Sequence, residues 1–156
     1  MIRPAAILLV LALIGDAAMA QDLAGQDFAA LRKAAPADAA QAATPFLNAG
    51  REAFAGQRWA AAYKGFAESA LIWPTPEALC ASAAALAMVP RANDSCENGH
   101  AGKLADLSRA YVLLAEAAQI SSEYGDTAPF GTEHALGMIH QASEDLRGAV
   151  AACAGN

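Results

Sequence analysis

Alanine is the residue that most restricts the fold of this chain, because it accounts for 44 of the 156 residues. Alanine has the highest intrinsic helix propensity, yet its side chain buries little apolar surface. The other hydrophobic types amount to 43 residues, of which 10 lie in the first twenty positions. We therefore expect many helices around a thin core, with close helix contacts at small side chains.

Residues 1–20 have the three-part layout of a secretory signal peptide. A short basic start contains Arg3, an apolar run occupies 5–14, and a tail of small residues ends at Ala20. We expect cleavage after Ala20, which would make the mature protein periplasmic or secreted. The apolar run is too short to cross a bilayer comfortably, so no stable membrane anchor is expected after cleavage; an uncleaved anchor is the alternative.

The charge balance restricts the class of partner. The chain has 10 Lys and Arg against 16 Asp and Glu, a formal net charge of -6, and no run rich in Lys or Arg. Proteins that bind nucleic acid neutralise phosphates with clustered basic residues. The composition therefore argues against nucleic acid, and against an anionic membrane surface, as the main partner.

The mature chain divides into two parts. Residues 21–43 are an Ala-rich N-terminal segment, in which we expect a short helix at 26–35 and then a loose linker. Thr44 supplies a capping hydroxyl and Pro45 suits the first helical position, so the all-helical domain is expected to begin here and to cover 44–156.

Within this domain, apolar periodicity and stop signals predict helices separated by short turns and one polar loop at 90–102. No strand pattern is present, and short turns favour antiparallel neighbours, which indicates an all-α fold built from helical hairpins. The expected helices cover 44–55, 58–73, 77–89, 103–124 and 132–153.

The last two of these helices carry the clearest apolar rows at alternating three- and four-residue steps. Polar residues such as Asp106 and Glu116 fall outside the first row. The predicted rows are Leu104, Leu107, Tyr111, Leu114 and Ala118 in one helix and Leu136, Ile139, Ser143, Leu146, Val150 and Cys153 in the other.

Export would place the three cysteines in a compartment that permits disulfides. Antiparallel packing of the last two helices brings Cys153 back towards the loop that holds Cys96. We therefore favour a Cys96–Cys153 pair and expect Cys80 to be a small buried residue. The spacing alone does not fix the pairing, and three separate thiols are the alternative.

The two helices at 44–55 and 58–73 carry a repeat-like pattern of aromatic and small residues. A Pro closes the segment before the next helix. The residues are Phe46, Ala49, Gly50, Ala53, Trp59, Ala62, Phe66, Ser69 and Pro74. This segment resembles a tetratricopeptide repeat, and 77–89 resembles a degenerate second unit. A plain Ala-rich helical bundle is the alternative, because small residues at a helix crossing give a similar pattern.

The tetratricopeptide resemblance implies a concave surface lined by first helices, on or near which Leu47, Arg51 and Phe54 would lie. In the family's clamp for peptide carboxylates, Lys is typical at the position of Leu47 and Asn at that of Arg51. This departure puts recognition of free C-termini in doubt. The resemblance therefore implies a partner-binding surface of a different specificity.

Catalytic and metal motifs are missing from the sequence. There is no Gly-x-Ser-x-Gly elbow, no phosphate-binding Gly-rich loop, no Cys-x-x-Cys and no His-Glu-x-x-His. The histidines are His100, His134 and His140; His134 and His140 each have a neighbour one helical turn away, at Met138 and Glu144, but neither pair makes a zinc ligand set. We expect no catalytic residue, no metal and no cofactor.

These features together predict an exported, non-enzymatic module that binds a protein or peptide partner in the cell envelope. The alternative is a small periplasmic helical bundle that binds an apolar ligand or regulates an envelope enzyme.

Overall fold

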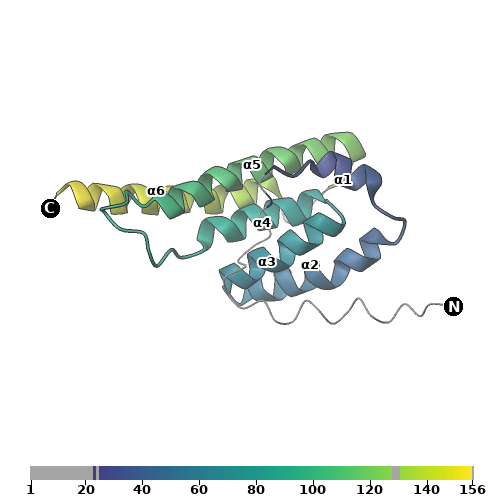
Figure 1. Cartoon of the computed structure of the whole chain (residues 1–156), viewed down its shortest axis with the longest axis horizontal. Helices are drawn as coiled ribbons and strands as arrows, with labels where there is room; N and C mark the ends of the chain where they lie inside the picture. The colour runs from purple at the N-terminus through teal and green to yellow at the C-terminus, as the bar shows by residue number, and fades with distance from the viewer. Residues whose placement is uncertain (1–22, 24, 128–130, 156) are drawn as a thin grey trace.

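The computed structural model describes residues 23, 25–127 and 131–155, and the predicted signal peptide lies outside them. The described residues form helices and no strand, so the predicted all-α class is confirmed (Figure 1). None of these helices is both long and apolar enough to cross a membrane. The helices are α1 (Phe28–Ala34), α2 (Ala39–Ala55), α3 (Trp59–Ile72), α4 (Pro76–Met88), α5 (Ala101–Tyr124) and α6 (Thr132–Ala154).

Helix α4 lies at the centre of the molecule, between the α2–α3 hairpin on one side and the α5–α6 hairpin on the other (Figure 1). Eleven of its thirteen residues are buried, and six of these are alanines. A helix that is apolar on every side is stable only when neighbours surround it. Its start is fixed by Thr75, whose hydroxyl accepts a hydrogen bond from the Ala78 backbone N–H at 3.1 Å, and by Pro76 in the first turn.

Helices α2 and α3 cross at two glycines. A Cβ placed on Gly65 would lie 2.6 Å from the backbone nitrogen of Gly50, and a Cβ on Gly50 would lie 2.6 Å from the Phe66 ring. No side chain fits at these distances, so both positions need glycine. The residues that resemble a tetratricopeptide repeat therefore lie along two helices in backbone contact.

Helix α2 begins at Ala39, five residues before the predicted start, and this expectation was wrong. Pro45 lies inside the helix, although an internal proline costs about 3 kcal/mol. The Thr44 hydroxyl bonds the Ala40 carbonyl at 2.9 Å instead of capping the helix. Burial of Ala39 and Ala43 and packing of α2 on α3 offset the proline, so the expected linker and the boundary at 44 fall within a helix.

The segment before α2 is also part of the folded domain. Phe28 is buried on α1, and the Arg32 guanidinium lies 3.7 Å from the Trp73 ring centroid and 5.0 Å from that of Tyr124. Arg32 also forms an ion pair with Asp126 at 2.8 Å. These contacts attach α1 to the end of α3 and the end of α5.

The buried face of α5 differs from the predicted row. Leu104 and Tyr111 are 57% and 49% exposed, whereas Asp106, which falls outside the predicted row, is 1% exposed. The buried side of α5 keeps Leu107 and Leu114 from the predicted row but is rotated away from Leu104 and Tyr111. The buried residues of α5 are Asp106, Leu107, Ala110, Leu113, Leu114, Ala117 and Ile120.

The same shift occurs in α6. Its buried residues are Ala135, Ile139 and Ala142, whereas Leu136 and Val150 from the predicted row are 42% and 46% exposed. Ile139 is therefore the one member of the predicted α6 row that is fully buried within the described residues.

Candidate functional site

The three residues proposed for partner binding on α2 have packing partners. Leu47 and Phe54 are half-buried against the core, and the Phe54 ring packs edge-on against Trp59 at a centroid distance of 5.2 Å. Arg51 is half-exposed and donates to Glu77 Oε1 from Nε at 2.9 Å. This surface offers a partner chiefly the exposed part of Arg51.

The loop between α4 and α5 is held by its own side chains. Asp94 accepts hydrogen bonds from the backbone N–H groups of Gly102 at 3.0 Å and Lys103 at 2.7 Å. Asn98 accepts from the Ser95 and His100 N–H groups at 2.9 and 3.1 Å. Asp94 therefore caps the start of α5, and a carboxylate at a helix N-terminus is also favoured by the helix dipole.

An ion pair between exposed Arg91 and buried Asp106 joins this loop to α5. Arg91 donates to both carboxylate oxygens of Asp106, from Nε at 2.6 Å and from a terminal nitrogen at 2.5 Å. The hydrogen bonds that Arg91 donates to Asp106 raise the pKa of Arg91. An unpaired buried carboxylate would be strongly destabilising, so Arg91 is what allows Asp106 to face α4.

Lys103 reaches from the first turn of α5 to the end of α4. Its ammonium donates to the carbonyls of Ala87 and, at 3.0 Å, of Val89, which are left without helical partners. Burial lowers the pKa of Lys103. Because its nitrogen is engaged by two carbonyls, we assign Lys103 a structural role.

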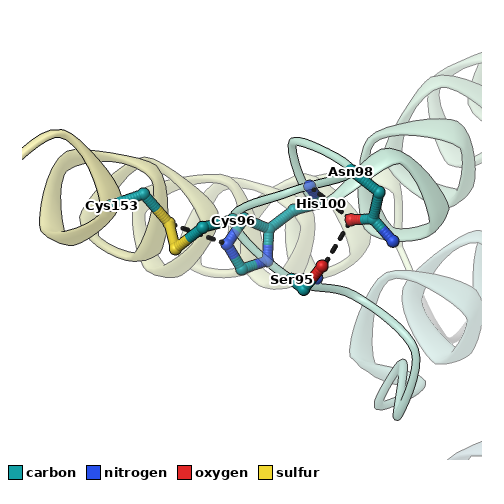
Figure 2. The surroundings of a disulfide bond; sticks show 5 residues. All are labelled: Ser95, Cys96, Asn98, His100 and Cys153. Atoms are coloured by element: carbon teal, nitrogen blue, oxygen red, sulfur yellow. Dashed lines mark hydrogen bonds between the residues drawn. A yellow bond between two sulfur atoms is a disulfide. The ribbon is translucent and has the colours of Figure 1, made fainter. Parts of the chain in front are cut away.

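A disulfide links Cys96 in this loop to Cys153 near the end of α6, across 57 residues of sequence (Figure 2). This is the pair that the antiparallel arrangement favoured. Cys80 is a buried free thiol, as expected, and its Sγ lies 3.8 Å from the Thr132 hydroxyl. Burial raises the pKa of Cys80.

The position of His100 beside the disulfide was not predicted from the sequence. Its Nε2 lies 3.6 Å from Cys153 Sγ, and Figure 2 shows the imidazole turned towards the disulfide. The three ligand atoms of Cys96, His100 and Cys153 lie within 4.8 Å of one another. The Cys96-x3-His100 spacing was the available signal, but it becomes informative only once Cys153 is placed beside it.

The other two histidines lie on α6, away from this group. His140 is 75% exposed and lies 3.9 Å from Glu144, which also pairs with Arg147 at 2.9 Å. His134 is exposed near the start of the same helix. Cys96, His100 and Cys153 are the one group of possible metal ligands found within the described residues.

A depression of about 280 Å³ lies beside His100, between the loop and α6. Its charged lining residues include Arg91, Asp94, Lys103 and Asp145. Arg91, Asp94 and Lys103 already have the structural partners described above.

The fold and these contacts define the chain as a small all-α protein whose two halves meet on a central alanine-rich helix. Comparison with known proteins adds no relative, because no family model, no curated protein and no solved structure matches the chain.

Proposed function

We propose that the chain is an exported protein-binding module whose α5–α6 hairpin holds one helical segment of a partner protein in the cell envelope. The observation that carries this proposal is the distribution of exposed apolar side chains. Six of the seven exposed large hydrophobic residues of the described chain lie on these two helices. They are Leu104, Tyr111, Val112 and Tyr124 on α5 and Leu136 and Val150 on α6.

Four of these side chains form two rows. Leu104 and Tyr111 are seven residues apart, and so lie on the same side of α5; Leu136 and Val150 are fourteen residues apart on one side of α6. Ala118 continues the α5 row and lines the same depression as Thr132 at the start of α6. We infer from this shared depression that the α5 row borders α6.

On α6, Leu136 lies three residues before buried Ile139, and Val150 lies three residues before Cys153. On α5, Leu104 and Tyr111 likewise lie three residues before the buried residues Leu107 and Leu114. We infer that the α6 row likewise borders α5, because Thr132 of that depression lies one helical turn before Leu136. We call the strip between Leu104, Tyr111, Leu136 and Val150 the α5–α6 groove.

One helix fits this groove better than a second copy of the chain. A groove between two helices with apolar residues at seven-residue steps matches the period of an amphipathic helix. A stable dimer buries roughly 800 Å² from each partner, which is more than four partly exposed side chains provide. The occupant we propose is therefore a single apolar-faced helix of another protein.

Two further features support an exported location and a binding role. The layout of residues 1–20 is that of a signal peptide, and a long-range disulfide is compatible with an oxidising compartment. The tetratricopeptide resemblance of the α2–α3 hairpin implies a protein-binding role as well. Its surface at Leu47, Arg51 and Phe54 is the alternative docking position.

The alternative function, binding of an apolar ligand, is supported by one depression. A depression of about 250 Å³ is lined by Leu23, Tyr63, Val112 and Leu113, together with three other residues. Pockets for small ligands occupy roughly 300–1,000 Å³, so this depression is at the lower limit.

The test is a pull-down from envelope extract, with the chain purified after export as bait. A captured protein counts as a partner only if the row variants recover less of it than the wild type does. We expect Leu104→Ser/Tyr111→Ser and Leu136→Ser/Val150→Ser each to reduce recovery at least tenfold. Val112→Ser is the matched control, because Val112 is 56% exposed on α5 but lies outside the rows. It should retain the partner.

Three results would refute the assigned surface. If the row variants and the wild type recovered the partner equally, the groove would not be the binding surface. If Arg51→Ala, and none of the row variants, lost the partner, the binding site would lie on α2. Sedimentation of the pure wild type as a dimer that the row variants convert to monomer would identify a second copy as the occupant.

A further inference from the structure

The end of α6 and the loop before α5 bring two sulfur atoms and an imidazole together. Cys96 is exposed, whereas Cys153 and His100 are partly buried, and their three ligand atoms lie within 4.8 Å of one another (Figure 2). Thiolate and neutral imidazole are the ligands that Zn²⁺ prefers in proteins. In the disulfide form, however, both sulfurs are committed to each other.

The loop that presents two of these ligands is held by contacts independent of the disulfide. Asn98 binds the N–H groups of Ser95 and His100, and its own amide donates to the Asn93 carbonyl at 2.7 Å. His100 has a left-handed backbone with φ of 54°, directly after Gly99 with φ of 59°. Such conformations in a residue other than glycine are kept where surrounding contacts enforce them, often at functional sites.

We propose that reduction of the disulfide converts this cluster into a binding site for one Zn²⁺, with Cys96, Cys153 and His100 as ligands and water in the fourth position. The distance of 3.6 Å between Cys153 Sγ and His100 Nε2 fits this geometry. Zn–S and Zn–N bonds of about 2.3 and 2.1 Å place tetrahedral ligands about 3.6 Å apart.

The remaining adjustment is small. Once the covalent bond is broken, the two sulfurs move to non-bonded contact, which is close to the separation of two thiolates on one zinc ion. Cys96 is the exposed partner and stands in a loop, so rotation of its side chain supplies this movement. Cys153 and His100 keep their present positions.

An external dithiol donates two electrons to the Cys96–Cys153 bond, becomes a disulfide itself, and leaves two protein thiols. Zn²⁺ binding displaces one proton from each thiol, and the imidazole contributes its nitrogen lone pair. In reverse, an oxidised dithiol takes two electrons from the thiolates, the disulfide forms again and Zn²⁺ is released.

The experiment uses Co²⁺ as a spectroscopic probe and Zn²⁺ in competition with it. The chain is purified after export in a Cys80→Ala background, so that the buried third thiol cannot contribute. After reduction with a phosphine, we expect one equivalent of Co²⁺ with thiolate-to-cobalt charge-transfer absorption, displaced by Zn²⁺. The oxidised chain should show no such absorption.

Two substitutions separate the ligands from the fold. Reduced His100→Ala should bind Co²⁺ at least tenfold more weakly, whereas His140→Ala, on the exposed side of α6, should bind as the parent does. In urea, the reduced parent should also bind Co²⁺ at least tenfold more weakly, because unfolding separates Cys96, His100 and Cys153.

The proposal is overturned if the reduced chain binds without charge-transfer absorption, if His100→Ala binds as tightly as the parent, or if the urea-unfolded chain does. A reduced chain that loses its circular dichroism and does not recover it with Zn²⁺ also overturns the proposal, since a preformed site should stabilise the fold.

Discussion

The α2–α3 and α5–α6 hairpins achieve cohesion by different means. In α2–α3, Gly50 and Gly65 bring the two backbones into contact, and Phe54 packs edge-on against Trp59 and Phe66 at centroid distances of 5.2 and 6.0 Å. In α5–α6, large apolar side chains such as Leu104, Tyr111 and Leu136 stay exposed, and a disulfide joins the loop before α5 to the end of α6.

This difference shows how an alanine-rich chain with few large core residues forms a stable fold. Close packing stabilises the α2–α3 hairpin, because interiors at crystal-like density gain from every atom in contact. Where packing is left incomplete, a covalent link restricts the unfolded chain instead. Incomplete packing also leaves an apolar surface available to a partner, which a closed hairpin does not.

The largest expected effect comes from removing the covalent link. Cys96→Ser/Cys153→Ser releases a loop of 57 residues, for which chain entropy gives a loss of about 4 kcal/mol in the free energy of unfolding. Urea unfolding measures this loss. Hydrogen exchange should show faster exchange in α5 and α6 than in α2 and α3.

Uniformly faster exchange in all helices would contradict this regional difference. A loss below about 1 kcal/mol would show that packing on α4 holds the α5–α6 hairpin without covalent help.

A smaller effect is expected at the glycine crossing. Gly65→Ala places a methyl group 2.6 Å from the Gly50 nitrogen and 2.8 Å from its Cα, so the two helices must separate. Overpacking of this kind costs about 1–3 kcal/mol. Thermal or urea unfolding should therefore show a clear decrease in stability.

Gly148→Ala in α6 is the matched control, because nothing lies within 4 Å of the added methyl group. Replacing an unconstrained helical glycine by alanine should stabilise the protein by about 1 kcal/mol. If Gly65→Ala and Gly148→Ala changed the free energy of unfolding in the same direction, the two hairpins would not differ in packing as the structure indicates.

Much of the helical layout was predictable, because proline and glycine mark the ends. The helix expected at 58–73 is observed as Trp59–Ile72, followed by Pro74. The start of α2 was not predictable in the same way, since Thr44-Pro45 is a typical helix start and tertiary packing overrode it. The buried face of α6 was misjudged because large residues were weighted as core whereas Ala135 and Ala142 were not. The face of α5 was misjudged because a carboxylate, Asp106, was not expected in the core.

The candidate site was predictable only in part. The Cys96–Cys153 pair follows from antiparallel helices, a feature of topology. The place of His100 depends on a left-handed backbone in a polar loop, which periodicity does not reveal. The burial of Asp106 likewise depends on Arg91, fifteen residues away with no shared helical face to connect them.

The smallest expected effect is a pH dependence that reports whether α6 remains on α4. Cys80 lies on α4 beside Thr132 of α6, and burial raises its pKa above the ordinary value of 9.0. In the folded state the thiol therefore stays protonated after the unfolded thiol has begun to ionise. Its stabilising contribution is complete below pH 9 and is lost as the pH rises through the folded pKa.

The measurement is the free energy of unfolding between pH 8 and 10.5 for the wild type and Cys80→Ala. The wild type should lose stability relative to the variant, with a slope of at most about 1.4 kcal/mol per pH unit. Lys103 acts in the opposite direction, because its pKa is lowered by burial, but it is present in both proteins and cancels.

The difference between the wild type and Cys80→Ala also tests the role of the disulfide. If the disulfide holds α6 against α4, the Cys96→Ser/Cys153→Ser background should expose Cys80 to water and reduce the Cys80-dependent slope. An undiminished slope in that background would mean that α6 stays on α4 through Ala135, Ile139 and Ala142 alone. The two hairpins would then differ in how closely their own helices pack, but not in how firmly each is held on α4.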